Sequence, residues 1–414
     1  MLSLCDCNNF FVSCERLYRP ELRNRAVVVL SSNDGCIIAR SNEVKAMGIK
    51  MGEPYYQVQH LLKRKGVVVC SGNLVAYKEI SEKVMQMLSR YTDNIECYSI
   101  DEAFLNFPLR VIKNPAEYAS KIRRHVDRVI GIPLSIGIAP TKTLAKLAAS
   151  RAKKNESGVL EISEQNRDGI LSETNAGDIW GIGYKAAEKL KRSAVITAAD
   201  FVRKDPVWVK KHLTIRGVMT QYELKGQPCI PLVTQPPPAK SIQVSRTWGT
   251  VLESAEDVYC AILDNVVKAG RLLRKDRLSA GAMAVYLRHG YRHYGECKYF
   301  TEDARFKSPI MSDIELMYAA RWLLGKIYRP GHRYSQGGVI LCNFSDVNFR
   351  QRELFDEDFH EKRLKYERFS QAVDEINDHF GERVIYPSAL AVKDKKWRPQ
   401  RKFLSERWNS LKLG

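Results

Sequence analysis

The feature that most constrains this chain is a pair of adjacent carboxylates inside an otherwise apolar run, Tyr98-Ser99-Ile100-Asp101-Glu102-Ala103-Phe104. The run is typical of a β-strand, in which successive side chains point to opposite faces. Asp101 and Glu102 can therefore serve one site only if the strand bends or bulges there. A regular strand would bury one of them, and a buried carboxylate without a partner is costly. The sequence thus predicts a cationic group nearby, either Lys/Arg or a metal ion.

A third acid, Asp6, lies in an equally strand-like run near the N-terminus, Leu2-Ser3-Leu4-Cys5-Asp6-Cys7. Two strands that each deliver carboxylates indicate a site of oxygen ligands for a hard divalent cation. Mg²⁺ is the expected ion, because it uses a few carboxylates together with substrate phosphates. Two such ions about 3.5–4 Å apart would stabilise the attacking and leaving oxygens of a phosphoryl transfer. The alternative is a strand end with one solvated acid and one ion pair.

The chain carries a large positive charge. Its 414 residues include 66 Lys and Arg against 47 Asp and Glu, which gives a net charge of +19. An excess of this size favours a polyanionic partner, nucleic acid before membrane. Without a signal peptide or a long apolar run, we expect a cytoplasmic protein that does not enter the membrane. The ten cysteines include no C-x-x-C pair, so a structural zinc is not expected.

The length and the residue pattern predict a multidomain α+β protein. Strands alternate with helices in the first part of the chain, and a proline-rich stretch at 230–241 is typical of a linker. A separate α+β unit is expected at 242–345, and the pattern fades after residue 345. The elements predicted from apolar spacing are strands at 26–30, 36–39, 67–70, 134–139, 242–248, 282–287 and 338–342, and helices at 74–92, 115–130, 254–275 and 312–326.

Two regions are candidates for binding a nucleic-acid backbone. Gly181 and Gly183 precede a helix that carries Lys185, and free N–H groups at a helix start suit an anion. This segment resembles a helix-hairpin-helix, which holds DNA without reading its bases. In the 242–345 unit, Arg246 and Arg288 belong to a basic set with interleaved tyrosines, which is plausible for a surface that lies along nucleic acid.

Several residues are candidates for contacts to a nucleotide. A helix carrying Arg40, Asn42 and Lys45 would present cationic groups, which hold phosphates well. On spacing alone, two solvated surface charges are the favoured alternative. Phe10 and Phe11 follow Asp6 closely, and they belong either to the core or to a surface that packs against a sugar or base.

The C-terminal region contains two candidate docking elements. The segment Gln351-Arg352-Glu353-Leu354-Phe355-Asp356 places Leu354 and Phe355 in polar surroundings without a local core. Such a segment is typical of a peptide offered to a partner's groove, although short segments of this kind are often loops. The last residues form a basic tail that includes Trp397 and Trp408.

Two stretches of this chain resemble the two catalytic motifs of Y-family translesion DNA polymerases. The first contains Asp6, Phe10 and Phe11, and the second is the Tyr-Ser-Ile-Asp-Glu-Ala run. Similar stretches occur at 33–40, 139–147 and 180–183. Within this family the chain is similar to the UmuC-like catalytic subunits of bacterial DNA polymerase V, of the plasmid or mobile-element type. The resemblance implies low-fidelity, template-directed synthesis across damaged DNA in the SOS response. A nucleotide cyclase or another palm-type phosphotransferase, and an inactive DNA-binding or SOS scaffold, are the alternatives.

The resemblance also implies a domain plan, that of a right-hand polymerase with a ferredoxin-like palm. Its parts would be the palm and fingers at 1–170, a thumb with the helix-hairpin-helix at 171–229, the linker at 230–241, a little finger at 242–345 and a partner-binding tail at 346–414.

Site residues follow from the resemblance by position. Asp6, Asp101 and Glu102, with the backbone carbonyl of Cys7, would hold two Mg²⁺ ions. Phe11 falls at the steric gate, where an aromatic ring excludes a ribose 2′-OH. The remaining nucleotide-site residues would be Phe10, Arg40, Asn42, Lys45 and Lys153.

Some of these positions have more specific expectations. Lys45 and Lys153 fall at the triphosphate of the incoming dNTP, whereas Asn42 replaces a phosphate-binding Tyr, so that contact is expected to be weaker or missing. Gln351, Leu354 and Phe355 would bind the β sliding clamp. Primer-template DNA, a UmuD′-like dimer and RecA are the other partners that the resemblance implies.

Overall fold

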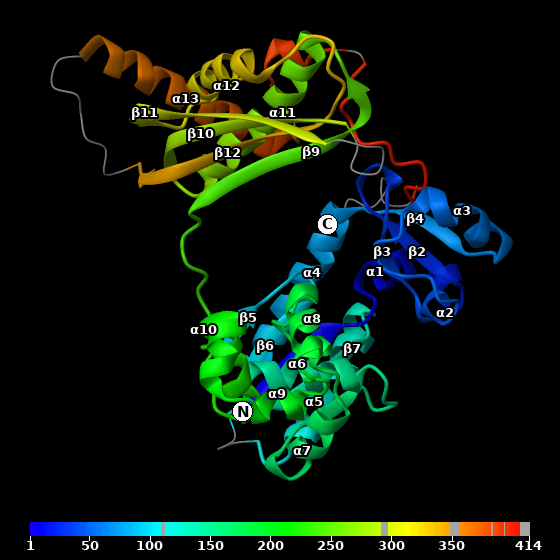
Figure 1. The fold of residues 1–414 in the computed structure, drawn as a ribbon. Coiled ribbons are helices and arrows are strands. Elements are labelled where there is room, and N and C mark those ends of the chain that lie inside the picture. Colours follow the sequence, from blue (N-terminus) through cyan, green and yellow to red (C-terminus); the bar gives the residue numbers. More distant parts are fainter. Residues whose placement is uncertain (109–111, 291–296, 348–356, 382–383, 393, 406–414) are drawn as a thin grey trace. The chain divides into compact units, whose positions relative to one another are not determined.

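The computed structural model describes residues 1–108, 112–290, 297–347, 357–381, 384–392 and 394–405, and for residues 357–360 the backbone alone. The chain forms two compact units (Figure 1). The first unit consists of residues 1–236 together with the chain from residue 402 onward, and the second consists of residues 237–401. The boundary at Pro236 and Pro237 lies inside the predicted linker.

The first unit is built on a five-stranded sheet with the order β5-β6-β1-β7-β8. Strand β1 lies at its centre and pairs antiparallel with both β6 and β7, while β8 runs parallel to β7. A central strand is covered on both faces, which agrees with the burial of β1 from Ser3 to Cys7. The strands are β1 (Leu2–Cys7), β5 (Ile95–Cys97), β6 (Glu102–Asn106), β7 (Leu134–Ala139) and β8 (Val159–Glu161).

Helices cover both faces of this sheet. Leu4 and Phe104 belong to a buried cluster with the alanine-rich helix α6 (Lys142–Ala152), whose N-cap is Thr141. On the other face, Cys5 and Ile136 belong to a cluster with α1, α4 and α5. These three helices are α1 (Phe10–Tyr18), α4 (Leu74–Leu88) and α5 (Pro115–Ile130). The predicted strand at 134–139 and helix at 115–130 are confirmed.

A smaller sheet follows α1, with the order β3-β2-β4. Its strand β2 is buried along its whole length and lies within the strand predicted at 26–30. Arg40 is the last residue of β3, so the prediction that it lies on a helix is wrong. The elements of this region are β2 (Val27–Leu30), β3 (Ile37–Arg40), α2 (Asn42–Ala46), α3 (Tyr55–Arg64) and β4 (Val68–Ser71).

A helical region completes the first unit. Gly181 has a φ of 92°, a left-handed conformation that favours glycine, and Gly183 is the N-cap of α8. Buried residues of this region share one core with α6, so the helices pack on the same side of the large sheet. The helices are α7 (Glu164–Glu173), α8 (Tyr184–Arg192), α9 (Ala198–Arg203) and α10 (Pro206–Leu224).

The second unit is a four-stranded antiparallel sheet with the order β11-β10-β12-β9. In Figure 1 its helices lie on one side of the sheet. Strand β11 is absent from the sequence prediction because charged residues recur along it and it lacks an apolar run. The elements are β9 (Ser241–Leu252), α11 (Ala255–Lys275), β10 (Leu278–His289), β11 (Lys298–Ile310), α12 (Asp313–Ile327), β12 (Tyr334–Asp346) and α13 (Glu357–Phe380).

After residue 345, the described residues form more regular structure than the fading sequence pattern predicts. Helix α13 is joined to α11 by an ion pair between Asp374 and Arg274, a buried arginine that also pairs with Asp313. Trp397 is 2% exposed in the core of the second unit, so its prediction as a docking residue is wrong. Trp408 and residues 351–356 lie outside the described residues. Among the helices that the structure describes, none is both long and apolar enough to cross a bilayer.

Gly137 on β7 allows α6 to lie close against the large sheet. A Cβ at this position would lie 2.1 Å from the backbone nitrogen of Ala149 and 2.3 Å from the carbonyl oxygen of Ala145. We predict that Gly137→Ala lowers the free energy of unfolding by about 2–3 kcal/mol, because the helix must move away from the sheet. Denaturant unfolding will measure this change.

The matched control is Gly169→Ala in α7, where the added methyl group meets nothing within 4 Å. That variant should gain up to about 1 kcal/mol from helix propensity. Equal stability of Gly137→Ala and the wild type would contradict the close packing described here.

Candidate active site

The ends of β1 and β6 bring two of the predicted acids together. Asp6 pairs directly with Glu102 in the antiparallel register. Residues directly opposite each other in such a pair have their side chains on the same face of the sheet. That face is the one covered by α6, because Leu4 and Phe104, two residues along each strand, pack against this helix.

Asp101 stands beside this pair because the chain turns sharply before it. Strand β5 ends at Cys97 and β6 begins at Glu102, and the N–H groups of Tyr98 and Ser99 both donate to the Glu102 carbonyl, at 3.0 and 3.1 Å. The prediction of one strand through residues 98–104 is therefore wrong for 98–101. The turn supplies the bend that two adjacent acids need in order to serve one site.

The turn is also fixed to the end of β1. The Ser99 hydroxyl donates to Asp101 Oδ1 at 2.6 Å. The N–H of Cys7 donates to the Asp101 carbonyl at 2.9 Å, so the backbone of the turn is held against β1.

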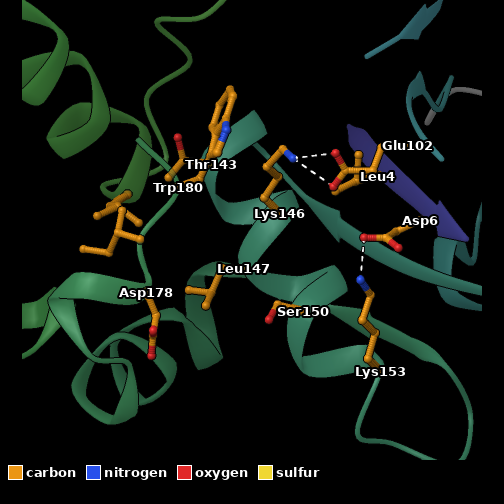
Figure 2. A pocket seen from close by; sticks show the side chains of 12 residues that line it. Leu4, Asp6, Glu102, Thr143, Lys146, Leu147, Ser150, Lys153, Asp178 and Trp180 are labelled. Carbon is orange, nitrogen blue, oxygen red and sulfur yellow. Dashed lines mark hydrogen bonds and ion pairs between the residues drawn. The ribbon is translucent and has the colours of Figure 1, made fainter. Parts of the chain in front are cut away.

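Helix α6 supplies the cationic partners that the sequence predicts. Lys146 Nζ lies 2.9 and 3.0 Å from the two carboxylate oxygens of Glu102, and Lys153 Nζ lies 2.6 Å from Asp6 Oδ2 (Figure 2). The two lysines are seven residues apart, about two helical turns, which places them on one side of the helix. The Lys146 ammonium also lies over the ring of Tyr98, at 4.3 Å from its centre.

Lys146 is a site residue that the sequence analysis missed. Its spacing of seven from Lys153 on one predicted helix is the signal that could have indicated it. Figure 2 shows its ammonium directed to Glu102, beside Trp180 from the segment that precedes α8. The centre of the Trp180 ring lies 5.4 Å from Lys146 Nζ, so the segment before α8 reaches this site.

The three acids are close enough to repel one another. Burial raises the pKa of Asp6 to about 6, and the nearby charges of Glu102 and Asp101 also raise it, whereas Lys153 lowers it. A carboxyl group in such surroundings binds a proton, an ammonium group or a metal ion more readily than a solvated one does.

A second set of polar groups gathers near Asp6. Lys45 Nζ lies 2.5 Å from Asn9 Oδ1 and 3.4 Å from Asn42 Oδ1, and the Asn9 amide donates to Asn42 at 3.0 Å. Burial lowers the pKa of Lys45, and the charges of Lys153 and Arg40 lower it further. Three cationic side chains that repel one another beside the acids are suited to a polyanion such as a triphosphate.

The remaining nucleotide-site candidates have distinct surroundings. Arg40 donates to the Ile49 carbonyl, while its buried Nε has no hydrogen-bond partner among the described residues. Phe10 is 4% exposed and packs in the core. Phe11 is half-buried, and its ring stacks on Tyr77 with 4.9 Å between the ring centres.

A cavity of about 270 Å³ lies between the large sheet, α6 and the segment before α8. Figure 2 shows how the acids and lysines of the site line one side of it. Its lining residues are Leu4, Asp6, Glu102, Thr143, Lys146, Leu147, Ser150, Lys153, Asp178, Ile179, Trp180 and Leu224.

The candidate DNA contacts of the second unit do not share a face. Arg288 alternates along β10 with Leu287, which is buried in the core, and so belongs to the opposite face of the sheet. Arg246 is an even number of residues from Ile242 and Trp248 on β9, so it belongs to the same face of the sheet as these two residues, which are buried under the helices. In the first unit, Lys185 is exposed on α8.

The acids of the site suit a divalent cation by their chemistry. In the described part of the chain, no three His, Cys, Asp or Glu side chains are arranged as a ready metal cluster, and lysines pair with two of the acids instead. Three mutually repelling carboxylates, one of them buried with a raised pKa, are nevertheless the donor set that Mg²⁺ prefers. A bound ion would have to displace the ammonium groups of Lys146 and Lys153.

Fold comparison finds solved Y-family DNA polymerases that share the fold of this chain. It matches a Y-family DNA polymerase chimera of Dbh and Dpo4 with a TM-score of 0.69 and 21% identity, over 83% of this chain and 99% of the other. It also matches an insertion ternary complex of Dbh DNA polymerase with a TM-score of 0.56 and 20% identity, again over 83% of this chain and 99% of the other. The multidomain α+β fold expected from the sequence is confirmed.

Residues 5–150 match the impB/mucB/samB family, and residues 239–354 match the C-terminal domain of that family. The chain belongs to this family. It is 32% identical to Protein ImpB of Salmonella typhimurium, over 100% of this chain and 99% of that protein. It is also 32% identical to Protein UmuC of Salmonella typhimurium (99% and 98%) and 28% identical to DNA polymerase IV of Desulfatibacillum aliphaticivorans (94% and 96%). The resemblance seen in the sequence is thereby confirmed.

The raised pKa of Asp6 predicts an inverse dependence of stability on pH. The folded state holds the Asp6 proton up to a pH of about 6 and the unfolded state only to about 4, so ionising this carboxyl destabilises the fold as the pH rises between these values. We expect metal-free Asp6→Asn to be more stable than the wild type at pH 8 by up to about 3 kcal/mol, and nearly equal to it at pH 4.

Denaturant unfolding in EDTA at several pH values measures the difference. The exposed Asp127→Asn serves as the control and should show no such trend. A difference between Asp6→Asn and the wild type that does not change with pH would contradict the burial argument.

Proposed function

We propose that this chain is a template-directed DNA polymerase of low fidelity that performs translesion synthesis, with Asp6, Asp101 and Glu102 as its metal-binding acids. The observation that carries the proposal is the convergence of three carboxylates where β1 meets β6, with cationic side chains beside them. Full-length similarity to UmuC and DNA polymerase IV proteins supports it. Polymerase ternary complexes among the similar structures support primer-template DNA and a dNTP as partners.

Asp6, Asp101 and Glu102, with the backbone carbonyl of Cys7, would hold two Mg²⁺ ions. When bound, such ions lower the pKa of the primer 3′-OH and neutralise the charge of the pyrophosphate leaving group. The acids deliver this charge balance only when they are ionised. Lys153 favours the ionised form of Asp6, because its adjacent ammonium group lowers the pKa of that carboxyl, and Lys146 forms an ion pair with Glu102.

Lys153, which pairs with Asp6, is also positioned to contact the substrate. The charge of Lys153 acts on both Asp6 and Lys45, so its ammonium group is near both the acids and the other cations. Because this side chain is 41% exposed and flexible, it can exchange the carboxylate for a phosphate oxygen. Arg40 and Lys45 would bind the rest of the triphosphate, with Asn42 orienting Lys45.

The alternatives explain less of the molecule. A nucleotide cyclase would need the paired acids but neither the helical region that reaches Lys146 through Trp180 nor the second unit. An inactive scaffold would not need Asp6, Asp101 and Glu102 to converge in a buried site that lowers stability. We therefore favour the polymerase.

The proposal extends to partners that relate to the SOS response. A UmuD′-like dimer, RecA and the β sliding clamp are proposed from the resemblance alone. The proposed clamp peptide, with Gln351, Leu354 and Phe355, lies outside the described residues. Residues Gly181, Gly183 and Lys185 are proposed to hold the DNA backbone, together with Arg288 of the second unit. Arg246 is not included, because its position on β9 puts it on the face that the helices cover.

The first test of the proposal is Asp101→Asn. We expect primer extension with Mg²⁺ to fall at least about a hundredfold, since the site loses a charge that stabilises the reacting groups. Binding of primer-template DNA should stay within about twofold, because Asp101 contributes no positive charge to phosphate binding. The control is the exposed Asp127→Asn on α5, which should extend primers like the wild type. Retained extension by Asp101→Asn would remove this residue from the proposed site.

A second test concerns the sugar. Phe11→Ala removes the half-buried ring at the proposed steric gate and should raise incorporation of ribonucleotides relative to deoxyribonucleotides by about tenfold or more. Phe11→Tyr keeps the bulk of the ring and should keep the selection. Single-nucleotide kinetics with matched dNTP and rNTP measure the ratio, and an unchanged ratio in Phe11→Ala would refute the gate assignment.

A further inference from the structure

The chain returns to the first unit at its C-terminal end. There Phe403 and Ser71, which ends β4, exchange two hydrogen bonds: the Ser71 N–H donates to the Phe403 carbonyl, and the Phe403 N–H donates to Ser71 Oγ, both at 2.9 Å. The Phe403 ring meets Tyr55 edge-on, with 5.6 Å between the ring centres, and packs against the core of the small sheet. Residues 402–405, called here the C-terminal strap, therefore complete this core. Figure 1 shows the strap in red beside β4.

Asp34 fixes the start of the strap. Its Oδ2 accepts the Lys402 N–H at 2.7 Å, and its Oδ1 accepts the Ser71 hydroxyl at 2.6 Å. Asp34 is 9% exposed, and a buried carboxylate needs donors to offset its lost hydration. The backbone of the strap supplies one of these donors, so the strap belongs to the hydrogen-bond network of the first unit.

The end of the strap reaches a second buried carboxylate. Glu15 on α1 is fully buried, and each of its oxygens accepts a hydroxyl: Oε2 from Ser405 at 2.8 Å, and Oε1 from Tyr77 at 2.6 Å. Ser405 is itself 5% exposed and 390 residues away from Glu15 along the chain. Neither hydroxyl takes part in the chemistry proposed above.

This network ends at the ring of the proposed steric gate. Tyr77, whose hydroxyl bonds to Glu15, stacks its ring on Phe11 at 4.9 Å and an angle of 21°. Phe11 also lies one helical turn before Glu15 on α1. A continuous series of contacts therefore runs from Ser405 through Glu15 and Tyr77 to Phe11.

We infer that the C-terminal strap positions the Phe11 ring and thereby sets how strongly the site excludes ribonucleotides. The inference rests on the proposed function, in which Phe11 contacts the sugar. Ser405, Glu15 and Tyr77 act as positioning residues. Without the Ser405 hydroxyl, a fully buried carboxylate loses one of its donors. Glu15 and Tyr77 then shift or admit water, and the surface against which Phe11 stacks moves with them.

The test compares kcat/KM for a dNTP with kcat/KM for the matching rNTP, using the full chain on primer-template DNA with Mg²⁺. Ser405→Ala should lower this ratio by about threefold to tenfold, the size of one ordinary intramolecular hydrogen bond. Its kcat/KM for the dNTP should stay within about twofold of the wild type. Ser405→Thr keeps the hydroxyl and should restore the ratio, while the exposed Ser172→Ala is the matched control.

Tyr77→Phe provides an independent variant, because it keeps the stacked ring and removes only the hydroxyl donated to Glu15. It should lower the ratio in the same direction as Ser405→Ala. A purely structural role for the strap would instead lower the melting temperature of both variants and leave the dNTP to rNTP ratio unchanged, which would overturn the inference.

The double variant Phe11→Ala/Ser405→Ala separates the inference from the proposal beneath it. If the strap acts through Phe11, the double variant should select sugars no worse than Phe11→Ala alone. If Phe11→Ala lowers selection and Ser405→Ala does not, the inference fails while the gate assignment stands. If Phe11→Ala itself leaves selection unchanged, the gate assignment and the inference both fail.

Discussion

The first unit depends on one electrostatic constraint, the need to neutralise three carboxylates that stand together in a partly buried site. Asp6 and Glu102 share a face because β1 and β6 pair in register, and Asp101 joins them because the chain turns at residues 98–101. Helix α6 meets this need with two ammonium groups on one side. The helix can lie so close to the sheet only because Gly137 has no side chain.

Buried acids tie distant segments into the same unit. Glu223 on α10 is fully buried and accepts backbone N–H groups from Thr143 at 3.0 Å and Cys229 at 2.7 Å. Glu96 on β5 pairs with Lys142 and accepts the N–H of Val233. The chain that leaves the first unit is thus anchored by carboxylates, as is the strap that returns to it. Each of these acids requires donors that come from another part of the fold.

The sequence predicted those elements that have a strong local signal. Strand 134–139 and helix 115–130 were found at their observed bounds, because apolar spacing and an Asn-Pro start mark them clearly. Strand β11 and helix α13 were missed, since charged residues recur along both and neither has a continuous apolar run. The prediction of a strand at residues 98–101 was wrong. The apolar residues there form a turn instead, and this turn depends on a hydrogen bond to the end of β1.

For the site, the sequence by itself determined which acids are available, that a cation must accompany them, and the family to which the motifs belong. The tertiary structure decided which cations they are, because Lys146 and Lys153 reach Glu102 and Asp6 only once α6 has packed on the sheet. It alone decided that Ser405 bonds to Glu15 beneath the proposed gate. Contacts between residues hundreds of positions apart leave no local pattern, since they arise from strand register and helix packing rather than from spacing along the chain.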